Sequence, residues 1–135
     1  MKFIKYSLIK LVKFLKIKLL IFILLKKNCE ISLNKINFKW DNNLIIKKNP
    51  EANNLIQLYA IQNNKYENEL VKIFLKYIKQ GYTCLDIGSC YGFFSLIMYK
   101  LSLKKVHIFE PNIDNCKIIK KNFEINNINE YELKK

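Results

Sequence analysis

The stretch "YTCLDIGSCYGFFSL", residues 82–96, constrains the fold more than any other part of the chain. It holds Gly88 and Gly92, two of only three glycines in 135 residues. The apolar run before Gly88 is typical of a buried parallel strand. The residues after Gly92 show the i, i+3, i+4, i+7 spacing of a helix, with Phe94, Ile97, Met98 and Leu101 on one face. A strand, a glycine turn and a helix in this order are the context of a nucleotide-binding fingerprint.

A second unit of the same kind follows. The segment "KKVHIFEPN" predicts a strand over 105–109 that ends at Glu110, 22 residues after Gly88. An acid at this place binds a ribose hydroxyl pair in dinucleotide folds, because carboxylate oxygens only accept hydrogen bonds. The segment "PNIDNCKIIKKNFEI" then predicts a helix with Asn112 as its N-cap. Its apolar face comprises Ile113, Cys116, Ile119 and Phe123. Residues 82–127 therefore predict a β-α-β-α unit, the first part of an α/β, Rossmann-like doubly wound sheet.

The segments before this unit predict supporting elements. "YENELVKIFLKYIKQG", residues 66–81, predicts a helix that Gly81 closes as a left-handed cap. Its apolar stripe comprises Leu70, Ile73, Phe74, Tyr77 and Ile78. Within 29–65, "KINFKW" and "NLIIKK" flank the turn-like "DNN" and predict two short strands that could pair as a hairpin. "PEANNLIQLYAIQ" predicts a short helix with Pro50 near its first turn. We interpret 29–65 as an N-terminal cover that carries no chemistry.

Residues 1–28 form a basic segment with three interpretations. Residues 1–27 contain eight lysines and no acid. Lysines interrupt the apolar residues before Leu19, and no small-residue cleavage site follows Leu25, which disfavours a spanning helix and a secretory signal. An amphipathic helix lying in a membrane interface fits the distribution of lysines. An ordinary helix that covers the core of its own protein remains the alternative.

The composition bears on two questions, whether the chain binds nucleic acid or metal and in which compartment it lies. The net charge is +13, but all 24 basic residues are lysine. Abundant Lys, Asn and Ile indicate an A/T-rich genome, and specific nucleic-acid readers rely on arginine, so we expect no nucleic-acid partner. Cys29, Cys84, Cys90 and Cys116 show no C-x-x-C spacing, and His107 is the only histidine. We therefore expect no metal site, reduced thiols and a cytoplasmic location, with the inner face of the membrane as an option.

The motifs together resemble a known family. "DIGSCYGFFSL" resembles the first motif of class I S-adenosylmethionine (SAM)-dependent methyltransferases, and with "FEPN" it resembles the FkbM family of that class. The family pattern is D-x-G-A-N-x-G-x-x-S, then F-E-P-x-P, then an Asn-rich stretch. The matching positions here are Asp86, Gly88, Gly92, Ser95, Phe109, Glu110 and Pro111, followed by "NFEINNIN". Tyr66 and Glu67 in "YENEL" resemble the family's Tyr-Glu before the first motif. Ser89 and Cys90 replace the family's Ala-Asn pair, and Ile113 replaces the second proline.

The resemblance, which covers about residues 66–130, implies a cofactor and a reaction. The turn from Gly88 to Gly92, with Ser89 and Cys90, would approach the methionine moiety of SAM. Asp86 would hold the amino group, Glu110 the ribose hydroxyls, and Asn112 would lie beside the adenine. The reaction would be methyl transfer, mostly to oxygen, on a small-molecule, glycan or lipid acceptor. No residue stands out as a catalytic base.

The extent of the chain sets a further expectation. An enzyme of this class has about seven strands, whereas we predict two core strands here, followed by "NEYELKK". We therefore expect residues 66–135 to be the first half of a SAM-binding domain, and the chain to be an N-terminal fragment that is inactive alone. The alternatives are a non-catalytic remnant or a small membrane-surface protein. A nucleotide-cofactor oxidoreductase would have a third glycine where Phe94 and Ser95 stand.

Overall fold

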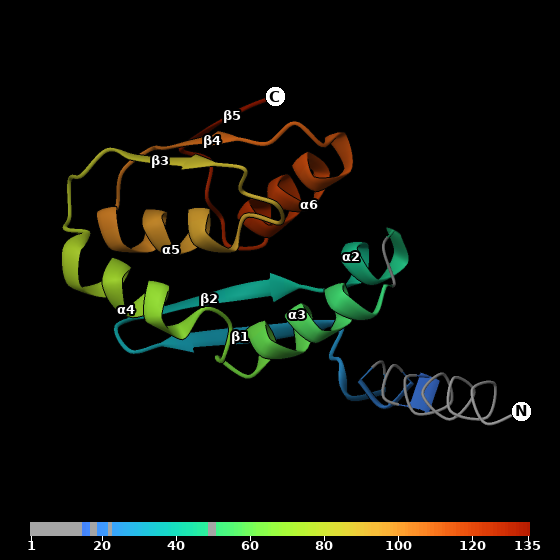
Figure 1. The fold of residues 1–135 in the computed structure, drawn as a ribbon. Helices are drawn as coiled ribbons and strands as arrows, with labels where there is room; N and C mark the ends of the chain where they lie inside the picture. Colours follow the sequence, from blue (N-terminus) through green and yellow to red (C-terminus); the bar gives the residue numbers. More distant parts are fainter. Residues whose placement is uncertain (1–14, 17–18, 22, 49–50) are drawn as a thin grey trace, which may run out of the picture.

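The computed structural model describes residues 15–16, 19–21, 23–48 and 51–135 (Figure 1). The N-terminal elements are β1 (Asn28–Leu33), β2 (Ile36–Asp41), α2 (Asn43–Lys48), α3 (Ala52–Gln62) and α4 (Asn68–Tyr77). They are followed by β3 (Cys84–Ile87), α5 (Phe93–Ser102), β4 (Val106–Phe109), α6 (Ile113–Glu124) and β5 (Tyr131–Lys134).

A parallel sheet with the strand order β3-β4-β5 carries the second half of the chain. The predicted β-α-β-α unit is confirmed as β3, α5, β4 and α6, and the fold is Rossmann-like. The expectation of only two core strands was wrong, because "YELK" forms β5 and pairs with β4. Tyr131 and Leu133 alternate with Glu132 and Lys134, which is the pattern of a strand with one covered face.

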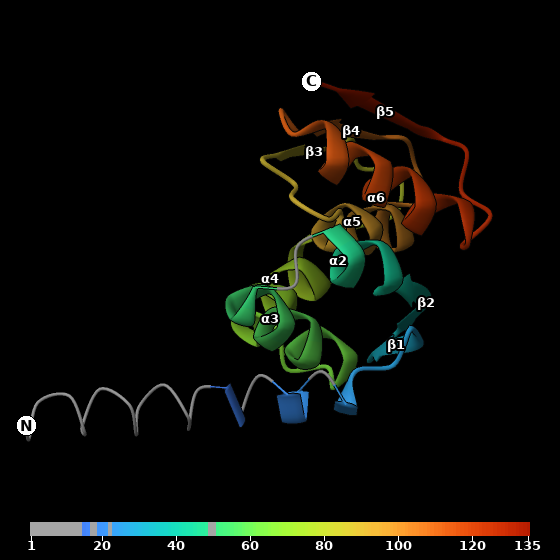
Figure 2. The same ribbon diagram turned by 90° about the vertical axis from the view of Figure 1, so that its right-hand side faces the viewer.

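Helices α5 and α6 form a layer between this sheet and the β1–β2 hairpin (Figures 1 and 2). Val106 and Ile108 of β4 are fully buried. Helix α5 contacts β2 as well as β3 and β4, so it is covered from two sides. This explains why Phe93 and Leu96 are buried in addition to the predicted Ile97.

The ring of Phe93 connects the hairpin to the glycine loop. Its centroid lies 5.9 Å from Phe38, 5.7 Å from Trp40 and 5.5 Å from Tyr66, in edge-to-face geometry each time. Such pairs add about 0.5–1.5 kcal/mol each beyond the burial of area. The hairpin and the β-α units therefore share one hydrophobic core.

The hairpin exists, but not where the sequence predicted it. Strand β1 pairs antiparallel with β2, and Leu33 lies opposite Ile36, so the turn falls at residues 34–35. The predicted second strand "NLIIKK" is helix α2. The Asp41 carboxylate accepts a hydrogen bond from the backbone N–H of Asn43 at 2.7 Å, at the start of that helix. A short apolar run does not distinguish a buried strand from a buried helix. The predicted helix around "ANNLIQLYAIQ" is confirmed as α3.

Helix α4 is shorter than predicted. It ends at Tyr77, and Ile78 at its C-cap is already extended. Gly81 is therefore not the cap; its backbone N–H donates to the Ser102 carbonyl oxygen at 2.7 Å. The predicted apolar stripe is only partly buried, since Ile73 and Tyr77 are 50% and 60% exposed.

The sheet face opposite α5 and α6 is bare in the described part of the chain (Figure 1). Leu85 and Ile87 are 54% and 75% exposed. Each lies beside a β4 residue of the same face, His107 and Phe109 respectively. The His107 ring is satisfied there, because its Nδ1 lies 2.7 Å from Glu132 Oε2. Parallel sheets are normally covered on both faces, so this surface is unusual.

The predicted amphipathic helix over residues 1–28 lies mostly outside the described residues. Within it, residues 15–16, 19–21 and 23–24 are helical. Five large apolar side chains in these pieces are 45–69% exposed: Leu15, Leu19, Leu20, Ile23 and Leu24. Within the described residues, no helix combines the length and the hydrophobicity that spanning a bilayer requires.

Candidate functional site

The predicted site residues gather where β3 and β4 end. Asp86 is on β3, and the loop that carries Gly88, Ser89 and Cys90 follows directly. Backbone hydrogen bonds hold this loop beside β4, since the Gly88 N–H donates to the Phe109 carbonyl oxygen at 2.8 Å. The topology thus brings together residues that are more than 20 positions apart in the sequence.

The two glycines of the loop have different surroundings. Gly88 has φ +74°, and a Cβ built on it would meet nothing within 4 Å. Its backbone therefore borders open space, as the approach of a ligand requires. Gly92 has φ +81°, and its Cβ would lie 3.1 Å from the Ile119 side chain of α6. Gly92 thus allows close packing between the start of α5 and α6, and its predicted part in cofactor binding stays a prediction.

Glu110 is buried, and its carboxylate is already engaged. Oε2 accepts from the Cys90 backbone N–H at 2.8 Å. Oε1 accepts from the Asn112 backbone N–H at 2.9 Å and from the Asn115 side-chain amide at 3.2 Å. A carboxylate offers about four acceptor positions, so about one remains for a ligand. The predicted contact with ribose is not tested by this arrangement and stays a prediction.

Asp86 is half-buried and accepts a hydrogen bond from the Ser95 hydroxyl. Burial raises the pKa of the Asp86 carboxyl above its usual value, although the Ser95 hydrogen bond opposes this shift. The negative charge of Glu110 raises it further. A cation placed beside Asp86 would relieve this unfavourable environment.

Asn112 is the N-cap of α6, as predicted. Its side-chain oxygen accepts from the backbone N–H groups of Asp114 at 2.8 Å and Asn115 at 3.2 Å. The residue is exposed and adjacent to Glu110. Its proposed place beside an adenine stays a prediction.

A cavity of about 100 Å³ opens beside the glycine loop. Asp86, Gly88, Ser89 and Cys90 line one side of it, and Gln57 and Tyr66 line another. Ser89 is 9% exposed, and its hydroxyl has no hydrogen-bond partner. The sequence analysis assigned no chemistry to residues 29–65 and so missed Gln57. The only sequence signal near this wall was the resemblance of Tyr66-Glu67 to a family motif.

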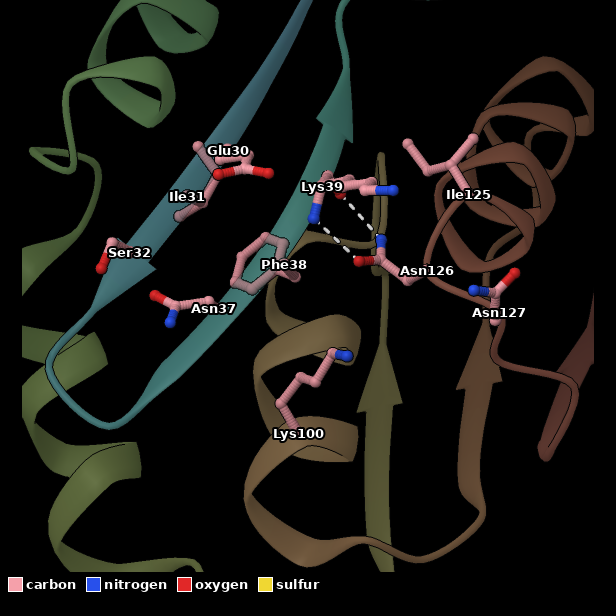
Figure 3. Close-up of a pocket in the computed structure, with 10 residues that line it drawn as sticks. All are labelled: Glu30, Ile31, Ser32, Asn37, Phe38, Lys39, Lys100, Ile125, Asn126 and Asn127. Atoms are coloured by element: carbon pink, nitrogen blue, oxygen red, sulfur yellow. Dashed lines mark hydrogen bonds between the residues drawn. The ribbon is translucent and has the colours of Figure 1, made fainter.

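Larger hollows lie away from the loop, beside the outer edge of β2. One of about 490 Å³ is bordered by Lys39, Lys100 and Asn126 (Figure 3). The Asn126 side chain there pairs with the backbone of Lys39 through two 2.7 Å hydrogen bonds. The neighbouring Asn122 accepts from the Asp41 N–H at 2.9 Å. The Asn-rich stretch that begins at Asn122 near the end of α6 therefore holds the hairpin. Among the described residues, none that borders these hollows also lines the cavity beside the glycine loop.

Comparisons with known proteins place the fold. No protein family and no curated protein matches the sequence. Among solved structures, M. jannaschii TYW2 in complex with AdoMet matches with a TM-score of 0.50 and 18% identity, over 80% of this chain and 42% of that one. P. horikoshii TYW2 in complex with MeSAdo matches with a TM-score of 0.48 and 16% identity, over 80% and 35%. This chain therefore spans less than half of either structure, and the likeness establishes a Rossmann-like fold.

Proposed function

We propose that this chain is the SAM-binding part of a SAM-dependent methyltransferase. The observation that carries the proposal is the glycine loop at the strand ends, where the Gly88 backbone borders open space beside a cavity that Asp86 and Ser89 line. Backbone without a side chain at this place allows the close approach of a ligand. The likeness to a structure of TYW2 with bound AdoMet supports the same cofactor.

The residues present fit such a cofactor. The Asp86 carboxylate would face the ammonium group, whose positive charge would offset the burial that raises the pKa of this carboxyl. Glu110 retains about one acceptor position for a ribose hydroxyl, and Asn112 would lie near the base. Bound SAM supplies an electrophilic methyl group, and the chain's contribution is to bind and orient it.

The finer assignment is also part of the proposal. The motifs favour the FkbM type and transfer to an oxygen of a small-molecule, glycan or lipid acceptor. The chain spans less than half of the M. jannaschii TYW2 structure, and we propose SAM binding for it rather than turnover.

The test is calorimetric titration of the whole chain with SAM and S-adenosylhomocysteine. Gly88→Ala should weaken binding at least tenfold, because the added methyl group would enter the open space beside the loop. Gly81→Ala is a matched control, since Gly81 also has positive φ and no neighbour within 4 Å of a built Cβ. Equal affinities of the two variants would contradict the proposal, as would the absence of binding to the unmodified chain.

A second candidate function is association with an anionic membrane surface. The supporting observation is the exposure of Leu15, Leu19, Leu20, Ile23 and Leu24 in a segment of eight lysines and no acid. We propose that these side chains enter the interface while the lysines meet anionic head groups. Co-sedimentation with phosphatidylglycerol vesicles should exceed that with phosphatidylcholine vesicles and fall in Leu19→Ser/Leu20→Ser. Leu85→Ser, on the distant sheet, is the control; equal binding to both lipids would contradict the idea.

A further inference from the structure

Helix α3 has an outer face without charge. Its inner side is in the core, where Leu55, Leu58 and Ile61 are buried. On the outer side, Ile56 and Tyr59 are 49% and 37% exposed, and none of the 11 residues of the helix is charged. A surface helix in water normally carries charged and polar side chains opposite the core. The outer face of α3 therefore has the composition of a contact surface.

The end of α3 holds the N-terminal helical pieces in place. The Gln62 side-chain oxygen accepts from the Lys26 backbone N–H at 2.7 Å, and the Gln62 side-chain N–H donates to the Leu24 carbonyl oxygen at 3.0 Å. Figure 2 shows the pieces running below α3. Tyr59 lies one turn before Gln62, and Ile56 one turn before Tyr59. The outer face of α3 therefore borders the N-terminal apolar strip, which comprises the exposed side chains of Leu15, Leu19, Leu20, Ile23 and Leu24.

The charge around these two surfaces is positive. Residues 1–65 contain 13 lysines and three acids, so they carry +10 of the net charge of +13. Lys26 and Lys65 are exposed near the end of α3, and the acid Glu51 lies at its opposite end. Lysines beside exposed apolar side chains match the head groups and the acyl boundary of an anionic bilayer. Tyrosine is enriched at this interface, because its ring is apolar and its hydroxyl is polar.

We propose that the outer face of α3, through Ile56 and Tyr59, docks on an anionic lipid bilayer beside the N-terminal apolar strip. This inference rests on the second candidate function, because it assumes that the N-terminal segment associates with membranes. It adds a contact that belongs to the folded domain, since Leu55 and Leu58 fix α3 in the core. The domain then binds in one orientation, with α3 against the head groups.

Matched pairs of variants test this contact on vesicles of equal parts phosphatidylglycerol and phosphatidylcholine. In the whole chain, Ile56→Ser/Tyr59→Ser should weaken binding about tenfold, because binding scales with the apolar area that enters the interface. Ile73→Ser/Tyr77→Ser is the control, since these residues are of the same types and are 50% and 60% exposed on α4. The control should bind as tightly as the unmodified chain. Circular dichroism compares the folding of both variants.

Tryptophan fluorescence tests the contact without removing an apolar side chain. Trp40 is the only tryptophan of the chain and is fully buried. In Tyr59→Trp, the new indole should be quenched by lipids that carry bromine on their acyl chains. In Tyr77→Trp, the new indole on α4 should not be quenched.

The outcomes separate this inference from the second candidate function. If Leu19→Ser/Leu20→Ser weakens binding but Ile56→Ser/Tyr59→Ser does not, α3 makes no membrane contact and the second candidate function stands. Equal losses in the α3 and α4 pairs, or an unquenched Tyr59→Trp, would also overturn the inference. If the unmodified chain does not bind these vesicles, the second candidate function fails and the α3 contact fails with it.

Discussion

The Glu110 carboxylate accepts a hydrogen bond from the Cys90 backbone amide at 2.8 Å, and so ties the end of β4 to the glycine loop after β3. Cys90 has φ +52°, a conformation that costs a non-glycine residue roughly 1–2 kcal/mol. A buried acceptor fixed at this point helps to hold the loop in that conformation. Glu110 therefore has a structural role that is separate from its predicted contact with ribose.

This relationship predicts that Glu110→Ala destabilises the fold by about 2–4 kcal/mol. The substitution leaves the Cys90 and Asn112 amides without their partner, and an unsatisfied buried group costs about 1–3 kcal/mol. Urea unfolding followed by circular dichroism measures the loss. Glu130→Ala, at an exposed position, is the control. A loss below ~0.5 kcal/mol would show that the fold does not depend on the Glu110–Cys90 hydrogen bond. A loss of cofactor binding in Glu110→Ala is interpreted only under conditions in which this variant is folded.

The two loop glycines should differ in stability when each is changed to alanine. Gly88→Ala meets open space and should cost only the strain of positive φ, about 1–2 kcal/mol. Gly92→Ala adds a 3.1 Å approach to Ile119, which is fully buried and cannot move freely, so we expect about 2–4 kcal/mol. Thermal unfolding of the two variants beside Gly81→Ala orders the three costs. A Gly92→Ala variant as stable as Gly88→Ala would mean that α6 moves to accommodate the methyl group.

The glycine loop was predictable because its key residues meet local backbone requirements. Gly88 and Gly92 adopt positive φ, which glycine allows, and Asn112 caps the first backbone N–H groups of α6. Strand β5 was missed because four residues are too few for their alternation of polar and apolar side chains to stand out, and no glycine or proline marks the ends of the strand. The hairpin was misplaced because "NLII" is too short for its period to decide between helix and strand.

The side of the cavity that Gln57 and Tyr66 line depends on tertiary packing. Gln57 becomes part of it only because α3 packs near Tyr66, which in turn contacts Phe93. No local pattern around Gln57 distinguishes it from a residue on an ordinary amphipathic helix. The double use of Glu110 was also hidden, because a sequence shows the position of an acid but not which of its oxygens are occupied.

Asp86 should make the stability of the unbound chain depend on pH. Burial raises the pKa of its carboxyl above the ordinary 3.8, so the folded state favours the neutral acid. The sign follows from this direction: the fold is most stable with respect to Asp86 below pH ~3.8, and it loses stability as the pH rises through the raised pKa. Asp86→Asn should therefore be more stable than the unmodified chain at pH 7, and the difference should shrink near pH 3.

Unfolding curves of both proteins from pH 3 to 7 test this dependence. Glu132, whose pKa is lowered by the hydrogen bonds from Lys134 and His107, titrates in both proteins and cancels in the difference. A constant difference across the range would exclude Asp86 as its source. Asp86→Asn should also lose SAM binding if Asp86 faces the ammonium group. The Asp86 carboxylate would then lower the stability of the unbound fold at pH 7 while contributing to SAM binding.

The Asn126 side chain should control how firmly the hairpin is attached to α6. It accepts from the Lys39 N–H and donates to the Lys39 carbonyl oxygen, both at 2.7 Å, as a neighbouring strand would (Figure 3). Asn126→Asp replaces the donor with an oxygen that faces the carbonyls of Lys39 and Asn122, so it should destabilise the fold by about 1–2 kcal/mol. Asn126→Ala should cost less, about 0.5–1.5 kcal/mol, because water can replace the exposed hydrogen bonds and no repulsion is added.

Hydrogen exchange of the Lys39 amide measures this attachment at the hydrogen bond itself. Exchange should accelerate in both variants, while the Ile108 amide inside the parallel sheet should change only as much as global stability changes. Glu130→Ala, at an exposed position outside these hydrogen bonds, serves as the control. If Lys39 remained protected in Asn126→Ala, the outer edge of β2 would not depend on Asn126. The hairpin would then be held by the Asp41–Asn122 hydrogen bond and by the contacts of the Phe93 ring with Phe38 and Trp40.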